Sequence, residues 1–179
     1  RNLRLEGGDI SFDVELGYPA KSQIATLRKL LIDGARTVPG ISNVSVNITS
    51  KVVSHAAQRG VQLLPGVRNI IAVASGKGGV GKSTTAINLA LTLVARGAKV
   101  GVLDADVYGP SLALLTGVHG RPDTTPDRKI MPLFGQGLKL MSMAFFMTDD
   151  SPVIWRGPMV HGLIKQFLTD VQWGELDYL

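Results

Sequence analysis

The chain has 179 residues, 45% of them hydrophobic and 18% charged, and none of them is cysteine. This composition is typical of a globular protein, and the lack of cysteine excludes disulfides and thiolate-bound metals or clusters within these residues. The net charge of +5 is scattered without a basic run, and no apolar run reaches the roughly 18 residues of a membrane span, so we expect a cytoplasmic protein without nucleic-acid or membrane partners.

Residues 1–50 predict a small β-α-β module. Strict alternation of apolar and polar residues over 10–16 predicts a half-buried strand. A helical stripe follows and ends at Pro39-Gly40, and alternation over 44–48 predicts a second strand. The stripe consists of Ile24, Leu27, Leu31, Ala35 and Val38. Residues 51–68, with their glycines and proline, predict a short helix and a linker.

The pattern changes at Asn69 to that of an α/β domain. Residues 70–74 are continuously apolar, as in a strand covered on both faces of a parallel sheet. We then expect a helix over 82–96, a strand over 100–103 and a short helix ending near Gly117. A loop or hairpin over 118–136 leads to a strand over 139–143. A helix opened by Pro158 and the start of a strand at 176–179 follow. These elements predict a doubly wound, mostly parallel sheet over 69–179, preceded by a small α+β domain. Because the chain stops inside an element, we expect a piece of a longer protein whose sheet is incomplete at the C-terminus.

The strongest motif is Gly76-Lys77-Gly78-Gly79-Val80-Gly81-Lys82-Ser83-Thr84, which fits the P-loop pattern G-x-x-x-x-G-K-S/T between a predicted strand and a predicted helix. Its glycines let backbone N–H groups turn inward around phosphate oxygens, and the helix N-terminus adds partial positive charge. We expect Lys82 to reach the β- and γ-phosphates of ATP, Ser83 to offer its hydroxyl to Mg²⁺, and Thr84 to contact the α-phosphate. The motif favours a nucleotide site over a glycine-rich turn without a ligand.

Lys77 is a second lysine that an ordinary P-loop does not need. The motif with two lysines resembles the deviant Walker A motif of the group of ATPases that includes MinD, the nitrogenase iron protein and Mrp. The resemblance implies that Lys77 crosses a homodimer interface and acts on the nucleotide of the partner subunit. A solvated surface lysine is the alternative interpretation.

Two carboxylates follow the predicted strand 100–103 at its C-terminal end, where ligands bind in open α/β sheets. Such groups bind the waters of Mg²⁺ or orient an attacking water. The resemblance places Asp106 at the switch I position, which implies a water-positioning role, and Asp104 is expected to support the magnesium shell. Either residue alone could be a solvated loop aspartate.

Two further segments, Asp104-Ala-Asp-Val-Tyr-Gly-Pro-Ser111 and Trp155-Arg-Gly-Pro-Met159, are similar to segments of the Mrp (ApbC-like) family of iron-sulfur cluster carriers. In that family a small iron-sulfur assembly domain often precedes the ATPase, which residues 1–50 fit. The resemblance implies a dimeric ATPase that holds a bridging 4Fe-4S cluster, hydrolyses ATP slowly and passes the cluster to apo iron-sulfur proteins. The family's Cys-x-x-Cys and its switch II segment are expected beyond Leu179, so residues 1–179 alone are expected to be poorly soluble, to hydrolyse little ATP and to bind no cluster.

Two other functions remain open at this stage. A MinD- or ParA-like positioning ATPase shares the P-loop but needs a C-terminal amphipathic helix or a basic surface to switch membrane or DNA binding. A reductase of the nitrogenase iron-protein kind also needs cysteines. The β-α-β module and the segment 155–159 favour the cluster carrier.

Overall fold

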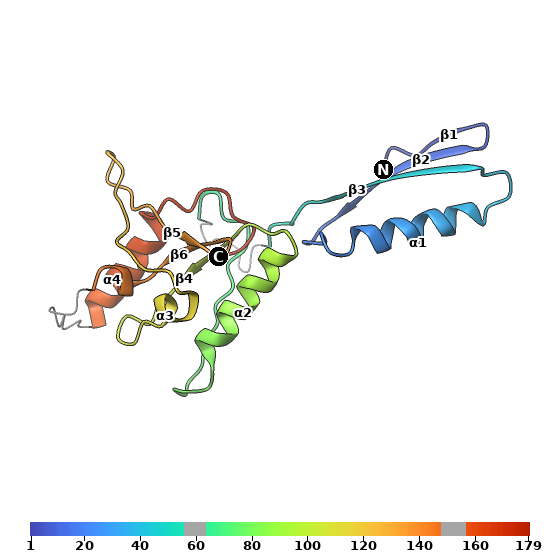
Figure 1. Cartoon of the computed structure of the whole chain (residues 1–179). Helices are drawn as coiled ribbons and strands as arrows, with labels where there is room; N and C mark the ends of the chain where they lie inside the picture. Colours follow the sequence, from blue (N-terminus) through green and yellow to red (C-terminus); the bar gives the residue numbers. More distant parts are fainter. Residues whose placement is uncertain (56–63, 148–156) are drawn as a thin grey trace. The chain divides into compact units, whose positions relative to one another are not determined.

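The computed structural model of the chain describes residues 1–55, 64–147 and 157–179 (Figure 1). The chain divides into two compact units. The first consists of Arg1–Val53 with Ala95–Gly97, and the second of Ser54–Val94 with Ala98–Leu179. The expected helix and linker over 51–68 and the segment 155–159 lie partly outside the described residues.

The first unit is a three-stranded sheet with one helix along it (Figure 1). Its elements are β1 (Arg4–Glu6), β2 (Asp9–Leu16), α1 (Ile24–Arg36) and β3 (Asn43–Ser50). β2 and β3 are parallel and joined by α1, and β1 pairs with β2 antiparallel. Both expected strands are confirmed, and burial alternates along β3, where Val46 and Ile48 are buried. It does not alternate along β2, where Ser11 and Asp13 are half-buried like Phe12, which pairs with Val46.

The helical stripe predicted for this unit extends beyond the end of the observed helix. α1 ends at Arg36, and the N–H of its C-cap Thr37 bonds back to carbonyls of the last turn. Val38 lies beyond the helix and is 54% exposed. Apolar periodicity alone does not register where a helix is capped, so Val38 was wrongly assigned to the stripe.

The second unit contains a sheet in the order β4-β6-β5. Its elements are α2 (Lys82–Ala95), β4 (Val100–Leu103), α3 (Leu112–Thr116), β5 (Leu133–Gly135), β6 (Leu138–Met141), the 3-10 turn η1 (Met143–Phe145) and α4 (Gly157–Thr169). β4 and β6 are parallel, and β5 is antiparallel to β6. The strand expected over 139–143 starts one residue earlier and ends at Met141, because Ser142 caps the 3-10 turn.

The alternation along β6 divides the core of this unit into two layers. Leu138 and Leu140 pack in one cluster with Ile87 of α2 and Leu112 of α3. Met141 packs in the other cluster with Phe167 of α4. Apolar side chains therefore leave the sheet on both faces and are covered by different helices. This is the arrangement of a doubly wound α/β fold, as the sequence predicted.

Two segments without named strands extend this sheet beyond β4. Residues 176–179 run parallel to residues 67–71 on one side and to β4 on the other, through the bridges Val67↔Leu176 and Val100↔Tyr178. Backbone bonds continue this pairing as far as Ile71, whose N–H donates to the carbonyl of Leu179 at 2.9 Å. The start of a strand expected at 176–179 is thus a segment that pairs on both of its sides.

Residues 70–74 do not form the fully covered strand that their apolar run predicted. Ile70 is 54% exposed and Ile71 is 43% exposed. Pairing with 176–179 stops at Leu179, the last residue of this chain, so the apolar run has no described neighbour along Ala72–Ala74. These residues line a cavity instead.

Candidate nucleotide site

The P-loop connects the exposed segment 70–75 to α2 and is itself exposed. Gly79 and Gly81 have φ angles of 72° and 84°, values that L side chains rarely adopt. A Cβ added at Gly76, Gly78, Gly79 or Gly81 would meet no atom within 4 Å. The loop therefore has open space beside these glycines, and its turn depends on glycine at two positions.

The loop leads directly into a helix N-terminus. α2 begins at Lys82, and its first backbone bond runs from Thr85 N–H to the carbonyl of Gly81 at 2.8 Å. The N–H groups at the start of a helix have no partner inside the helix, and they carry partial positive charge. With the ammonium of Lys82 and the hydroxyls of Ser83 and Thr84, this end of α2 presents donors and cations to an anion.

A cavity of about 590 Å³ lies beside this helix end. Four of the residues singled out from the sequence line it: Lys82 and Ser83 from α2, and Asp104 and Asp106 from the segment after β4. Its other walls include residues 70–75, β4 and the segment 178–179. The fold therefore brings the P-loop lysine and serine to the same hollow as both carboxylates. The loop glycines, Val80 and Thr84 do not line it.

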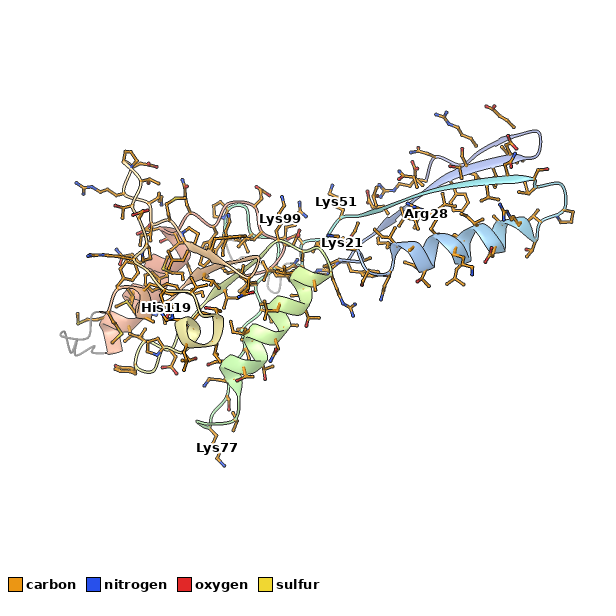
Figure 2. The ribbon with its side chains drawn as sticks, viewed as in Figure 1. Lys21, Arg28, Lys51, Lys77, Lys99 and His119 are labelled. Carbon is orange, nitrogen blue, oxygen red and sulfur yellow. The ribbon has the colours of Figure 1, made fainter. Side chains whose placement is uncertain are left out.

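Lys77 lies apart from this cavity. Figure 2 shows its side chain at the far end of the loop, pointing away from the sheet. Its backbone is fixed by the Ser75 hydroxyl, which accepts from Lys77 N–H and lies 3.1 Å from Lys77 O. Within its own subunit this ammonium therefore faces away from the cavity that Lys82 lines.

The two carboxylates after β4 are held by the surrounding backbone. Asp104 accepts from the N–H groups of Asp106, Ser111 and Leu112 at 3.0–3.2 Å. Asp106 Oδ1 accepts from Gly109 N–H at 3.0 Å, which closes a turn. The loop after β4 is thus fixed by side-chain acceptors at both of its aspartates.

Sequence reasoning missed Ser142, which is fully buried beside this loop. Its hydroxyl lies 3.3 Å from Asp104 Oδ2 and accepts from Ala144 N–H at 3.2 Å. The sequence signal for Ser142 was its position: it lies two residues after Leu140, on the same face of the strand as Leu138 and Leu140. A hydroxyl at an apolar position needs a buried partner, and that partner is Asp104.

Tyr178, in the wall of the cavity, has a raised pKa. Burial of Tyr178, followed by the nearby negative charge of Asp177, raises the pKa of its phenol above the ordinary value. The phenol of Tyr178 therefore keeps its proton to higher pH than an exposed tyrosine.

The donor set fits a nucleotide with Mg²⁺ better than it fits a protein-bound metal cluster. An open loop of glycines, a helix N-terminus and Lys82 suit phosphate oxygens, and Ser83 supplies a hydroxyl of the kind that Mg²⁺ accepts. Among residues 1–55, 64–147 and 157–179, no three histidine, aspartate or glutamate side chains are grouped to hold a metal ion. In the same ranges no helix is long and apolar enough to cross a membrane.

Comparison with known families gives two matches that together cover most of the chain. Residues 66–179 match the family described as NUBPL iron-transfer P-loop NTPase. Residues 1–48 match the family described as iron-sulfur cluster assembly protein. The descriptions of the two families fit an iron-sulfur cluster carrier better than a positioning ATPase.

Curated relatives carry consistent names. An iron-sulfur cluster carrier protein of Synechocystis is 42% identical over 187 residues, which cover 100% of this chain and 52% of the relative. The carrier protein of Escherichia coli K12 is 53% identical, covering 64% of this chain and 31% of the relative. The mouse iron-sulfur cluster transfer protein NUBPL is 50% identical, covering 65% and 37%. The chain spans about half the length of the relatives that it matches most fully.

A solved structure with the same fold contains a nucleotide. A nucleotide-binding protein of Archaeoglobus fulgidus, in complex with ADP, superposes with a TM-score of 0.54 and is 41% identical. The match covers 65% of this chain and 44% of that protein. The second unit therefore has a P-loop NTPase fold of the nucleotide-binding kind.

Proposed function

Because the chain belongs to the family of NUBPL iron-transfer P-loop NTPases, we propose that the protein carrying it is an ATP-dependent iron-sulfur cluster carrier. The observation that supports this most is the cavity that gathers Lys82, Ser83, Asp104 and Asp106 beside the P-loop. The proposed protein is a homodimer that binds a 4Fe-4S cluster and transfers it to apo iron-sulfur proteins. The chain has no cysteine, so thiolates outside these residues would bind the cluster.

We propose that ATP binds along residues 76–84. The backbone N–H groups of the loop and the N-terminus of α2 receive the phosphates, and Lys82 balances the charge of the β- and γ-phosphates. Ser83 supplies a hydroxyl ligand for Mg²⁺, and Thr84 contacts the α-phosphate. When bound, Mg²⁺ neutralises charge on the phosphate oxygens. The expected contribution of Asp104 to the magnesium shell stays a prediction.

We assign the attacking water to Asp106. Its carboxylate lines the cavity with Lys82, and the bond from Gly109 N–H leaves Oδ2 and the second lone pair of Oδ1 to accept from a water. An oriented water beside a fixed phosphate gains rate chiefly through positioning. Asp106 is therefore proposed as a catalytic residue of slow ATP hydrolysis.

Lys77 is proposed to act in trans. Its side chain extends away from the cavity of its own subunit (Figure 2), so its charge is available to a second subunit docked at the loop. A cation delivered across an interface stabilises charge on the transferring phosphoryl group, as an arginine finger does. Dimerisation would then complete the active site.

The first unit is proposed to assist cluster assembly. We propose domain boundaries at 1–50 for this small domain, 51–68 for the linker and 69–179 for the part of the ATPase domain. The match of residues 1–48 to an iron-sulfur cluster assembly protein supports the first of these.

Cluster transfer by the full-length protein tests the proposal. The protein is reconstituted with iron and sulfide, mixed with the apo form of a 4Fe-4S enzyme, and followed by the recovery of that enzyme's activity. We expect transfer by the full-length protein and no cluster absorbance from residues 1–179 alone, which serve as the control because they lack cysteine. Failure of the reconstituted full-length protein to restore any activity would contradict the proposed function.

A further inference from the structure

Asp104 uses both of its carboxylate oxygens inside the protein. Oδ1 accepts from Asp106 N–H at 3.0 Å. Oδ2 accepts from Ser111 N–H at 3.1 Å, from Leu112 N–H at 3.2 Å and from the Ser142 hydroxyl at 3.3 Å. Each carboxylate oxygen has about two acceptor sites, so Oδ2 is fully used by its three donors, whereas Oδ1 keeps one further site.

These bonds satisfy backbone donors at the start of α3. Ser111 occupies the N-cap position of α3, but its side chain makes no capping bond. Asp104 receives the N–H groups of Ser111 and Leu112 instead, and its charge suits the positive end of a helix. The start of α3 is therefore tied to the end of β4, and the turn that contains Asp106 lies between these two fixed points.

Ser142 ties the same carboxylate to the neighbouring strand. β4 and β6 end side by side, with Leu103 paired to Met141 and Asp104 N–H donating to Met141 O at 2.9 Å. Ser142 follows at once, fully buried, with its hydroxyl between Asp104 Oδ2 and Ala144 N–H. The position of the carboxylate is thus set from two strands.

We propose that Asp104 and Ser142 are positioning residues that fix Asp106 in the cavity, and that Asp104 affects hydrolysis through Asp106. This inference rests on the proposed role of Asp106 in hydrolysis. For a magnesium-bound water, only the second acceptor site of Asp104 Oδ1 remains. A bond between Asp104 Oδ1 and Asp106 N–H, in contrast, transmits any displacement of the carboxylate directly to the backbone of the catalytic residue.

A double-mutant cycle in the full-length protein tests whether Asp104 acts through Asp106. The variants Asp104→Asn, Asp106→Asn and the double variant are compared by kcat, by KM for ATP and by the Mg²⁺ concentration at half-maximal rate. We expect Asp104→Asn to lower kcat by about 10- to 100-fold, the scale of a misplaced catalytic group, with KM and the Mg²⁺ dependence unchanged. The double variant should be no slower than Asp106→Asn. Multiplied losses, or a higher Mg²⁺ requirement in Asp104→Asn, would overturn the proposal.

Amide hydrogen exchange tests the positioning without any need for hydrolysis. Asp104→Asn should speed exchange at Asp106, Ser111 and Leu112, and Ser142→Ala should do so to a smaller extent. Exchange at Ile87, in the core of α2, should not change. Thr92→Ala is the matched control, because it removes an exposed hydroxyl that donates to Asn88 O in its own helix. Unchanged exchange in the loop would overturn the proposal, whereas a wild-type protein that hydrolyses no ATP would contradict only the proposed function.

Discussion

Arg68 and Asp177 form an ion pair in which Arg68 Nη1 lies 2.7 Å from Asp177 Oδ1. The other carboxylate oxygen accepts from Lys99 N–H at 2.9 Å. Asp177 therefore joins the segment that leads to the P-loop with the segment that leads into β4. Its side chain is 12% exposed, so the carboxylate itself lies largely away from water.

Asp177→Ala should destabilise the second unit by about 1–3 kcal/mol, because a charged donor and a backbone N–H lose their acceptor. Urea unfolding measures the change. Asp170→Ala is the matched control, since its ion pair with Lys129 at 3.5 Å is more exposed and should contribute about 0–1 kcal/mol. Equal losses of unfolding free energy in the two variants would show that the bonds of Asp177 contribute no more to stability than an exposed ion pair.

Gly101→Ala should also destabilise this unit, by about 1–3 kcal/mol, because the added methyl group overfills the core. Its Cβ would lie 2.8 Å from Leu176 Cδ1, 2.9 Å from Leu179 Cδ1 and 3.0 Å from Trp173 Cε3. Gly162→Ala in α4 should have the opposite sign and stabilise by about 0.5–1 kcal/mol, since a Cβ there meets nothing within 4 Å and alanine favours a helix. Thermal unfolding of both variants checks the pair of signs, and a stabilised Gly101→Ala would contradict the packing described here.

Tyr178 should make stability fall at alkaline pH. Its pKa is raised by burial in the folded state, so the folded protein holds the phenolic proton more tightly than the unfolded chain. The resulting stability is fully present below the unfolded pKa of about 10 and is lost as pH rises through the folded pKa. Unfolding of wild type and Tyr178→Phe at a series of pH values isolates this group, and a difference between them that does not change above pH 10 would rule the effect out.

The sequence was informative where local pattern determines structure. Alternation located β2 and β3, and the P-loop with its flanking apolar runs located α2 and β4. It failed where tertiary contacts decide. The bond between Ser142 and Asp104 joins residues 38 apart in the chain, so the register of Ser142 could mark it as buried but could not identify its partner. The exposure of residues 70–74 likewise depends on how far a neighbouring segment pairs, which their own composition does not encode.

Lys77 should matter for turnover more than for nucleotide binding, because its charge is proposed to act across the dimer. We would mix Lys77→Ala subunits with Asp106→Asn subunits and measure ATP hydrolysis. In each mixed dimer, the site on the Lys77→Ala subunit keeps its Asp106 and receives the partner's Lys77. Partial recovery of activity is therefore expected. If the mixture is as inactive as each variant alone, Lys77 acts within its own subunit; if Lys77→Ala alone is as active as wild type, Lys77 has no role in turnover.

Calorimetry of ATP binding in the presence of Mg²⁺ tests the central claim, that the P-loop of this chain is a nucleotide site. Lys82→Ala removes the cation that lines the cavity and should weaken binding severely. Arg121→Ala is the control, because it removes a cation from the exposed loop before β5 and should leave the affinity unchanged. Equal affinities of wild type and Lys82→Ala for ATP would contradict the assignment.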